Sequence, residues 1–149
     1  MTSDMPKIRI DDRSGLRPEL SRLIDNRGVL PLAMWARIVA ERTASLFPDS
    51  DPIAEATVLC SEVVDGFTDG TMSVGEIRRR GFAVHALAKE CEGAEQAAVR
   101  TVGHALSVCH MREHAIVASD YAILTLNLLY PGDTDSVVEE RTLQIRDLS

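Results

Sequence analysis

The chain has 149 residues and a mass of 16.3 kDa; 45% of the residues are hydrophobic, 26% are charged and only 4% are aromatic. This composition predicts one globular domain whose core contains few large side chains. With 16 basic against 23 acidic residues, the net charge is −7 and the isoelectric point is about 5.0. The charge argues against a nucleic-acid or anionic-membrane partner, and it leaves a basic protein partner open.

The three cysteines form an odd set without a Cys-x-x-Cys pair: Cys60, Cys91 and Cys109. This pattern predicts reduced thiols rather than a disulfide framework or a zinc knuckle. The first seven residues lack the apolar segment of a signal peptide, and the low-charge run 115–131 is too short to span a bilayer. We therefore expect a cytoplasmic protein without a membrane span.

The first part of the chain divides into an arm and two helices. Residues 1–16 are polar and are expected to form an N-terminal arm, followed by a single helical domain over 17–149. A short helix is predicted over about 18–24, because a proline suits its first turn, and a longer one over about 31–47. The apolar face of the longer helix is predicted to contain Trp35, Val39 and Leu46.

A third helix is predicted after two prolines that separate it from the second. It should run over about 52–64, with Asp51 as its N-cap and a proline at its first position. The glycine-rich stretch 65–71 is expected to end this helix. Gly66 and Gly70 can take the left-handed conformation there.

The tetrapeptide Ser73-Val-Gly-Glu76 is a capping-box pattern, in which Ser accepts a bond from the third amide and Glu reaches back to the cap amide. The helix behind it has one face of small and apolar residues: Ile77, Gly81, Val84, Ala88 and Cys91. A further helix over about 94–109 has a similar face: Ala98, Val102, Ala105 and Cys109. Such small residues predict close helix contacts, at the low end of roughly 8–10 Å between axes.

The segment 111–130 is apolar almost all round, which is typical of a helix in the middle of a bundle. Pro131 and Gly132 end it, and a last amphipathic helix is predicted over about 134–146. The inner face of that helix is expected to contain Val138, Arg141, Ile145 and Leu148. Without strand patterns or long repeats, the sequence predicts an all-α fold, a single compact bundle of about five to seven helices with a central apolar helix.

All four histidines lie in the second half of the chain: His85, His104, His110 and His114. The last two are one turn apart, so on a continuous helix both could bind one metal ion, with His85, His104 or Glu113 completing the ligands. If the chain turns near His110, the pair is split between two helices. The alternative interpretation is structural, with the imidazoles hydrogen-bonded inside a close-packed bundle.

Arg42 lies on the predicted apolar face of its helix, where a charge must find a carboxylate or reach water. Glu41 projects to another side of that helix, so the partner is expected from a different element. Four acidic residues are candidates between which the sequence does not choose: Glu62, Glu76, Glu113 and Asp120. Asp120, isolated on an apolar helix, is interpreted as a cap or as the partner of an Arg or His.

No motif for nucleophilic catalysis occurs in the sequence. There is no Gly-x-Ser-x-Gly and no phosphate-cradling glycine loop, and Cys109 and His110 diverge by about 100° on a helix. The metalloprotease pattern His-Glu-x-x-His and the di-iron pattern Glu-x-x-His are also absent. The basic run 78–80 is interpreted as a solvated face. The sequence therefore identifies no catalytic residue and no cofactor.

A series of short motifs covers about residues 32–125. They are Trp35-Ala36, Ala40-Glu41-Arg42, Leu46-Phe47, Ser73-Val-Gly-Glu76, Val84-His85-Ala86 with Ala88, Val102-Gly103-His104-Ala105, Cys109-His110, His114-Ala115 and Tyr121-Ala122. Their order and spacing resemble those of the immunity proteins of bacterial polymorphic toxin systems. The tail of that family is matched by Glu140-Arg141 with Leu143-Gln144, whereas its Arg-Pro, Ile-Glu-Ala and Trp motifs are replaced around Asp51-Pro52, Phe67 and Gly70.

The resemblance implies a small cytosolic all-α protein that neutralises a cognate toxin, without an established catalytic residue. It singles out seven positions as a candidate functional cluster: Trp35, Glu41, Arg42, His85, His104, His110 and His114. The leading hypothesis is a non-enzymatic protein-binding factor that covers a toxin with an acidic surface, and net charge −7 suits a basic toxin. The alternatives are a metal-binding helical-bundle protein or enzyme that uses the four histidines, and a homo-oligomeric scaffold.

Overall fold

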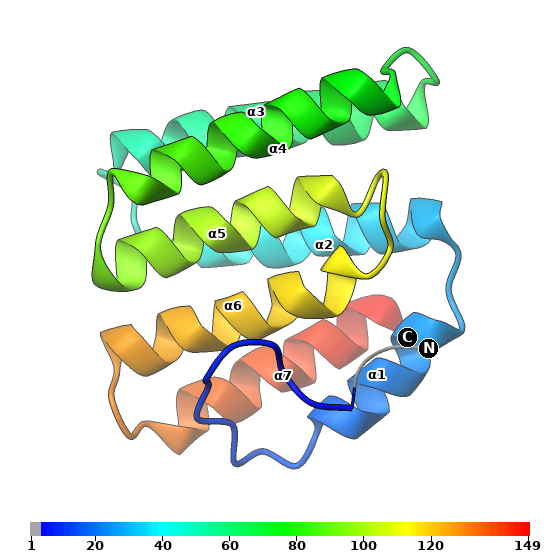
Figure 1. Cartoon of the computed structure of the whole chain (residues 1–149). Coiled ribbons are helices and arrows are strands. Elements are labelled where there is room, and N and C mark those ends of the chain that lie inside the picture. The colour runs from blue at the N-terminus through cyan, green and yellow to red at the C-terminus, as the bar shows by residue number, and fades with distance from the viewer. Residues whose placement is uncertain (1–3) are drawn as a thin grey trace.

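The computed structural model describes residues 4–149, which form seven α-helices and no strand (Figure 1). The helices are α1 (Arg17–Asp25), α2 (Val29–Ala44), α3 (Asp51–Thr68), α4 (Val74–Lys89), α5 (Gly93–Ser107), α6 (His114–Leu129) and α7 (Thr134–Leu148). The predicted all-α bundle is confirmed. None of the helices within the described range is long and apolar enough to cross a membrane.

Side chains just before α3 and α4 fix where these helices begin. The Ser73 hydroxyl accepts a hydrogen bond from the Glu76 amide at 3.2 Å, as a capping box predicts. The Glu76 carboxylate accepts from the same hydroxyl at 3.1 Å rather than from the cap amide. The second hydrogen bond of the capping box therefore joins two side chains. The cap of α3 is Ser50, which accepts from the Ile53 amide, and not Asp51, which is the first helical residue.

The end of α3 lies four residues beyond its predicted end, because Gly66 is helical and buried rather than left-handed. A Cβ at this position would lie 3.0 Å from the Cβ of Met72, so glycine lets the following loop fold against the helix. Gly70, with a φ of +71°, makes the left-handed turn as predicted. The two neighbouring glycines therefore serve different purposes.

Two predicted inner faces differ from the observed ones. Since α2 ends at Ala44, Leu46 lies in the following turn and is 39% exposed. In α7, Val137 is buried and Val138 is 37% exposed. Three polar residues make up much of the buried face of α7: Glu140, Arg141 and Gln144. Arg141 and Leu148 are buried as predicted, whereas Glu140 and Gln144 were missed because buried polar side chains carry no hydrophobic signal.

The helices are stacked in layers (Figure 1). One layer holds α3 and α4, the next holds α2 and α5, and α6 lies between this middle layer and α7, with α1 beside α7. The predicted central apolar helix corresponds to α6, which packs against α1, α2, α5 and α7. The centre is shared with α5, which packs against α2, α3, α4 and α6 through small buried residues: Ala98, Val102 and Ala105.

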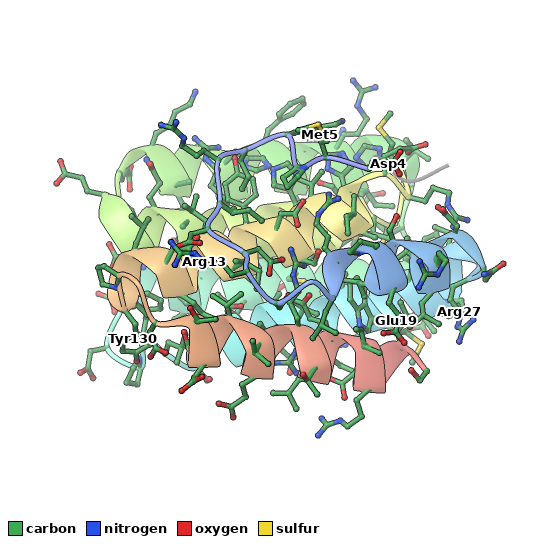
Figure 2. All side chains as sticks on the ribbon, turned by 90° about the horizontal axis from the view of Figure 1, so that it is seen from below. Asp4, Met5, Arg13, Glu19, Arg27 and Tyr130 are labelled. Atoms are coloured by element: carbon green, nitrogen blue, oxygen red, sulfur yellow. The ribbon has the colours of Figure 1, made fainter. Side chains whose placement is uncertain are left out.

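The N-terminal arm, described from residue 4 to residue 16, contains no helix and runs along α6 (Figure 2). The Asp11 amide donates to Oδ1 of Asn127 at 2.7 Å, and Nδ2 of Asn127 donates back to the Asp11 carbonyl at 3.0 Å. One residue later, the Asp12 carboxylate accepts from Nε of Arg141 at 2.8 Å. The arm is thus bonded to α6 and α7 by specific polar contacts.

Candidate functional site

The seven residues of the predicted functional cluster lie in two separate regions. Trp35, Glu41 and Arg42 belong to α2, whereas the four histidines lie on α4, on α5, in the connection after α5 and at the start of α6. No hydrogen bond, ion pair or ring contact within residues 4–149 joins the two groups directly. The seven residues therefore do not form the single cluster that was predicted from the sequence.

The first region, which we call the imidazole cluster, consists of His85, His104, His110 and His114. Its rings form a chain of contacts: the centroid distances are 5.0 Å for His85 and His104, 5.1 Å for His104 and His114, and 5.7 Å for His110 and His114. On its other side, His104 stacks on Tyr121 at 5.1 Å with an interplanar angle of 14°. Helices α4, α5 and α6 thus bring together histidines that are up to 29 residues apart.

Hydrogen bonds within the cluster limit which ring nitrogens can carry protons. Nη1 of Arg100 lies 2.9 Å from Nδ1 of His85, and because a guanidinium only donates, this Nδ1 accepts and the ring proton of His85 is on Nε2. The Nδ1 atoms of His104 and His114 lie 2.8 Å apart, so one donates and the other accepts. The two rings of this pair cannot both carry a proton on Nδ1 without losing the bond.

The imidazoles are held in the neutral form. Burial lowers the pKa of His104 to about 3, and the charges of His85, His114, Arg100 and Lys7 act in the same direction. Burial and the Arg100 charge lower the pKa of His85 to about 4. The pKa values of His110 and His114 are also lowered, chiefly by burial. At neutral pH, the cluster therefore adds polar rings but no charge.

Glycine at position 103 makes room for the cluster. A Cβ at Gly103 would lie 2.8 Å from Cε1 of His85 and 3.0 Å from its Nε2, so the ring of His85 lies directly against the backbone of α5. The sequence pair Gly103-His104 therefore has two linked functions: the glycine admits one imidazole and the next residue supplies another.

The predicted metal-binding alternative depended on His110 and His114 sharing one helix. They do not: α5 ends at Ser107 and α6 begins at His114, so His110 lies in the connection, which is the split that the sequence left open. Within residues 4–149, no group of three His, Cys, Asp or Glu side chains is arranged to hold a metal ion. The geometry of the imidazole cluster gives the metal-binding alternative no support.

The second region is built around Arg42. Its Nε and Nη2 donate to the two carboxylate oxygens of Glu140 at 2.6 and 2.9 Å, and its Nη1 donates to Asp147 at 2.9 Å. Burial lowers the pKa of the Arg42 guanidinium, and these two carboxylates raise it by more. The predicted ion pair between helices therefore exists, but all four predicted partners were wrong: Glu62, Glu76, Glu113 and Asp120.

Asp120 belongs to a neighbouring set of buried charges, which we call the ion-pair network. It accepts from Nε and Nη2 of Arg17 at 3.0 and 2.8 Å and from Nη2 of Arg141 at 2.7 Å. Arg141 is fully buried and also donates to Asp12, Ser119 and Gln144. The interpretation of Asp120 as an arginine partner agrees with this geometry, and Arg141 lies on the inner face of α7 as predicted.

Trp35 and Gln144 connect the ion-pair network with Arg42. The indole Nε1 of Trp35 donates to the Gln144 carbonyl at 2.9 Å, which ties α2 to α7. The side-chain Nε2 of Gln144 donates to Glu140 at 2.9 Å, the same carboxylate that binds Arg42. The sequence signal for this arrangement was the Glu140-Arg141 and Leu143-Gln144 tail motif, whose polar members are all buried.

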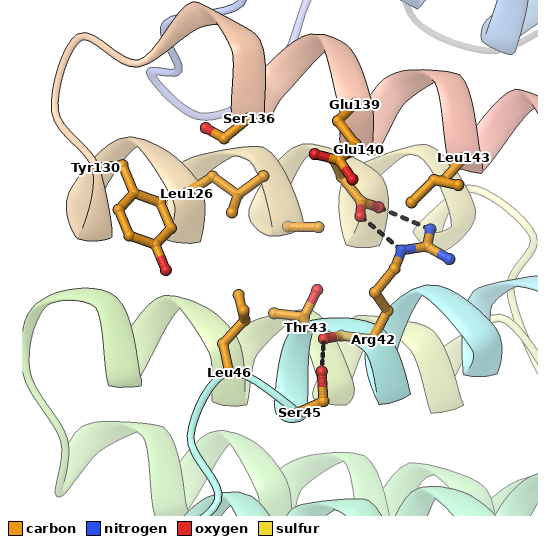
Figure 3. Close-up of a pocket in the computed structure, with 11 residues that line it drawn as sticks. Arg42, Thr43, Ser45, Leu46, Leu126, Tyr130, Ser136, Glu139, Glu140 and Leu143 are labelled. Carbon is orange, nitrogen blue, oxygen red and sulfur yellow. Dashed lines mark hydrogen bonds and ion pairs between the residues drawn. The ribbon is translucent and has the colours of Figure 1, made fainter.

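A cavity of about 240 Å³ lies beside Arg42, between α2, α6 and α7 (Figure 3). Much of its wall is apolar: Leu46, Leu126, Tyr130 and Leu143. The Glu140 carboxylate faces it but is bonded to both Arg42 and Gln144. Such a carboxylate is positioned to hold helices together rather than to move a proton.

Glu41 is the exposed member of the predicted cluster. It accepts from Nε of Arg37 at 2.8 Å, and the same guanidinium donates to Asp65 at 2.8 Å and to Ser61 at 3.1 Å. Glu41 therefore orients an arginine that bridges α2 and α3 at the protein surface.

The three cysteines are free thiols, all buried. Burial raises the pKa of Cys60 and that of Cys109 to about 12, and the pKa of Cys91 to about 11. The thiols therefore stay protonated at neutral pH, whereas a cysteine nucleophile needs the thiolate. This agrees with the absence of a nucleophile motif in the sequence.

A comparison with known protein families gives a match over most of the chain. The family model described as "Imm-5 like putative immunity protein" matches residues 25–149, more than four fifths of the chain. The chain belongs to this family. The resemblance drawn from the ordered motifs is thereby confirmed. A search of curated proteins and a search of solved structures each found no match.

The Imm-5-like match begins near the end of α1, so the arm and most of α1 precede it. These preceding residues nevertheless contribute Asp12 and Arg17 to the ion-pair network, whose other charges, Asp120 and Arg141, lie inside the matched region. The imidazole cluster lies entirely inside it. In this chain, therefore, the network depends on residues outside the family match, and the cluster does not.

Proposed function

We propose that this Imm-5-like protein is a non-enzymatic immunity protein, which binds a cognate toxin in the cytoplasm of the producing bacterium and blocks its activity. The observation that carries the proposal is the family match over residues 25–149. The chemistry of the described residues supports binding rather than catalysis, since the thiols are buried and protonated and the Arg42 and Asp120 charges are engaged in ion pairs. Ser107, whose hydroxyl lies near the neutral imidazoles, donates its proton to the Gly103 carbonyl rather than to a histidine.

The outer surface of α2 and α3 is the best candidate for the toxin contact. Met34 and Ile38 are one turn apart on α2 and are 53% and 46% exposed. Arg37, beside them, reaches across to Ser61 and Asp65 of α3, and Val58, one turn before Ser61, is 57% exposed. We call this surface the α2–α3 face. Exposed apolar residues ringed by charges are typical of protein-binding surfaces.

The charge of this part of the chain supports a basic partner. Residues 28–72, which include α2 and α3, contain seven acidic and two basic residues, whereas residues 73–112 contain four acidic and six basic ones. The acidity of the protein is therefore concentrated partly on the α2–α3 side. Complementary charge would speed association with a basic toxin and would make the association rate fall as salt is added.

Co-expression with the toxin encoded beside the gene tests the proposal directly. We expect the protein to relieve toxicity and to co-purify with the toxin. Unchanged toxicity in the presence of folded protein would overturn the proposal.

The contact surface is tested by a matched pair of variants. Ile38→Lys places a positive charge on the α2–α3 face, and Leu128→Lys does the same at an equally exposed apolar residue of α6, 47% exposed against 46%. We expect Ile38→Lys to weaken toxin binding by at least about tenfold and Leu128→Lys by much less, because apolar and charged contacts at an interface centre dominate affinity. Equal effects would show that the contact lies elsewhere. The α2–α3 face could instead bind a second copy of the chain. Light scattering on the isolated protein measures its molar mass and so tests this alternative.

A further inference from the structure

A second cavity opens next to the imidazole cluster, and none of the residues that line it was assigned to the α2–α3 face. It has a volume of about 200 Å³ and lies between α4 and the connection from α5 to α6. Its lining includes three imidazoles, from His85, His110 and His114, together with Arg78. Phe82, 67% exposed, also lines it. We call this space the imidazole cavity.

Most of the charged groups around the imidazole cavity are cationic, in a protein that is acidic overall. Arg78 acts electrostatically on His110, Arg100 and Lys89 act on His85, and Lys7 of the arm acts on His104 and His114. One carboxylate opposes them, Glu113 beside His114. The local potential is therefore positive, and at physiological salt it is set by these neighbours, because charges beyond roughly 8 Å are screened.

Arg78 differs from the other arginines of its basic run. Arg80 forms an ion pair with Glu62, and Arg79 lies over Gly75, outside the cavity lining. Arg78 lines the cavity, and among residues 4–149 no carboxylate pairs with it. A guanidinium next to a cavity and without an acidic partner is available to bind an anion.

The imidazoles add hydrogen-bond donors from other directions. Because Nδ1 of His85 accepts from Arg100, its proton is on Nε2. When His104 donates to Nδ1 of His114, the proton of His114 is also on Nε2, and the neutral ring of His110 carries one N–H. Ser107, also in the lining, already donates to the Gly103 carbonyl at 2.8 Å, and its oxygen can still accept. Donors on α4, on the α5–α6 connection and on α6 approach from different sides, which suits a tetrahedral oxyanion better than a planar carboxylate.

We propose that the imidazole cavity is a binding site for a phosphate group, held by the Arg78 guanidinium and by N–H groups of His85, His110 and His114. The site is separate from the α2–α3 face and does not depend on the proposed toxin contact. The exposed ring of Phe82 lies beside it, where it can contact an organic portion of a phosphorylated ligand.

The test uses the full-length protein without a His tag, labelled with ¹⁵N in its histidines, and inorganic phosphate as the probe. Imidazole resonances are followed at pH 7 during titration with sodium phosphate, against sodium chloride of equal ionic strength. We expect a saturable shift of the His85, His110 and His114 signals with phosphate and none with chloride.

Two neighbouring variants supply the control, since each removes one positive charge from the same basic run. Arg78→Gln should weaken phosphate binding by about tenfold, the effect of losing one charge-assisted contact, and Arg79→Gln by less than about twofold. If both variants weaken phosphate binding equally, the affinity depends only on the net positive charge of the basic run and not on Arg78, and the proposal is overturned. It is also overturned by a titration without saturation, or by one in which acetate saturates the same signals and phosphate does not, which would identify a carboxylate site instead.

Discussion

The ion-pair network and the imidazole cluster solve the same problem, the burial of polar side chains between helices, in opposite ways. In the network, fully buried Arg141 is surrounded by Asp12 and Asp120, and Asp120 also binds Arg17. In the cluster, like groups contact one another and stay uncharged, because burial lowers their pKa values. Charges can thus be buried when opposite signs alternate, and titratable rings can be buried together when they give up their protons.

Helix α6 takes part in both regions. Asp120 belongs to the ion-pair network, and the next residue, Tyr121, stacks on His104 of the imidazole cluster. Consecutive side chains on a helix diverge by about 100°, so one helix can present a carboxylate to α1 and α7 and an aromatic ring to α5. The two regions therefore share a scaffold but should respond to different perturbations.

The largest effect is expected from breaking the ion-pair network. Asp120→Asn keeps the shape of the side chain but removes the charge that faces Arg17 and Arg141, and it should lower the free energy of unfolding by about 3–5 kcal/mol. Urea unfolding followed by circular dichroism at pH 7 measures the loss.

Asp65→Asn is the matched control, because it removes a carboxylate that pairs with Arg37 at the protein surface. We expect a loss below about 1 kcal/mol there. A loss below about 1 kcal/mol for Asp120→Asn as well would mean that the buried charges of the network do not depend on each other.

Acid should weaken the imidazole cluster before it weakens the ion-pair network. The pKa of His85 is about 4 and that of His104 about 3 in the folded protein, below the ordinary value of 6.5, so below pH 6.5 the unfolded chain binds protons that the folded chain excludes. The histidines therefore cost no stability above about pH 7, and they lower the stability of the protein as the pH drops from 6.5 toward 3. Because the rings are partly exposed, we expect a loss of about 1–2 kcal/mol between pH 7 and pH 5.5.

The carboxylates that pair with Arg141 and with Arg42 affect stability in a lower pH range. The pKa values of Asp12 and Asp147 lie below the ordinary value of 3.8, so the stability that they contribute is present above pH 3.8 and is lost below it.

His85→Gln should flatten the stability profile between pH 7 and pH 5.5, since the amide can still accept from Arg100 and does not titrate. The free energy of unfolding is measured with urea at each pH. If it falls between pH 7 and pH 5.5 as steeply in the variant as in the original protein, the loss does not come from the imidazole cluster.

Sequence reasoning succeeded where a residue type acts through its neighbours in the chain. The seven helices follow from apolar spacing, prolines and caps, and the small-residue face of α5 was predicted from Ala98, Val102 and Ala105. It failed where a polar residue is buried by a distant partner. Arg42 was correctly predicted to need a carboxylate, but Glu140 was missed because the polar inner face of α7 has no apolar periodicity to orient the helix.

The candidate site was predicted as a list of residues and not as an arrangement. The histidines were expected either to share a metal or to be hydrogen-bonded in the bundle, and their spacing in the chain gives no information on how α4, α5 and α6 pack. Gly103 shows the difficulty: its role in admitting the His85 ring becomes visible only when α4 lies against α5. Contacts between helices, rather than within them, are what the sequence left undetermined.

A smaller effect is expected where the imidazole cluster depends on that glycine. Gly103→Ala should cost about 1 kcal/mol net, since the clash with His85 outweighs the roughly 1 kcal/mol that alanine gains over glycine in a helix. In a His85→Ala background, the clash is absent, and the same substitution should stabilise the protein. Gly75→Ala, whose Cβ would meet Arg79 at an ordinary 3.6 Å, should show no such change of sign. The four free energies of unfolding come from urea titrations. If Gly103→Ala is destabilising in the His85→Ala background as well, the glycine is not needed to make room for the His85 ring.

The smallest effect on stability is expected at Glu41, because this residue lies at the surface and belongs to neither buried region. Glu41 is exposed and pairs with Arg37 four residues earlier on α2, a geometry worth about 0.3–0.5 kcal/mol, and Arg37 keeps Asp65 and Ser61 as partners when Glu41 is changed. Glu41→Gln should therefore leave urea unfolding nearly unchanged. If the α2–α3 face binds the toxin, the same variant should still slow association measurably at low salt, because a carboxylate at the rim of an interface acts on the encounter rate. A loss of stability above about 1 kcal/mol would instead place Glu41 with the ion-pair network, as a residue that the fold requires.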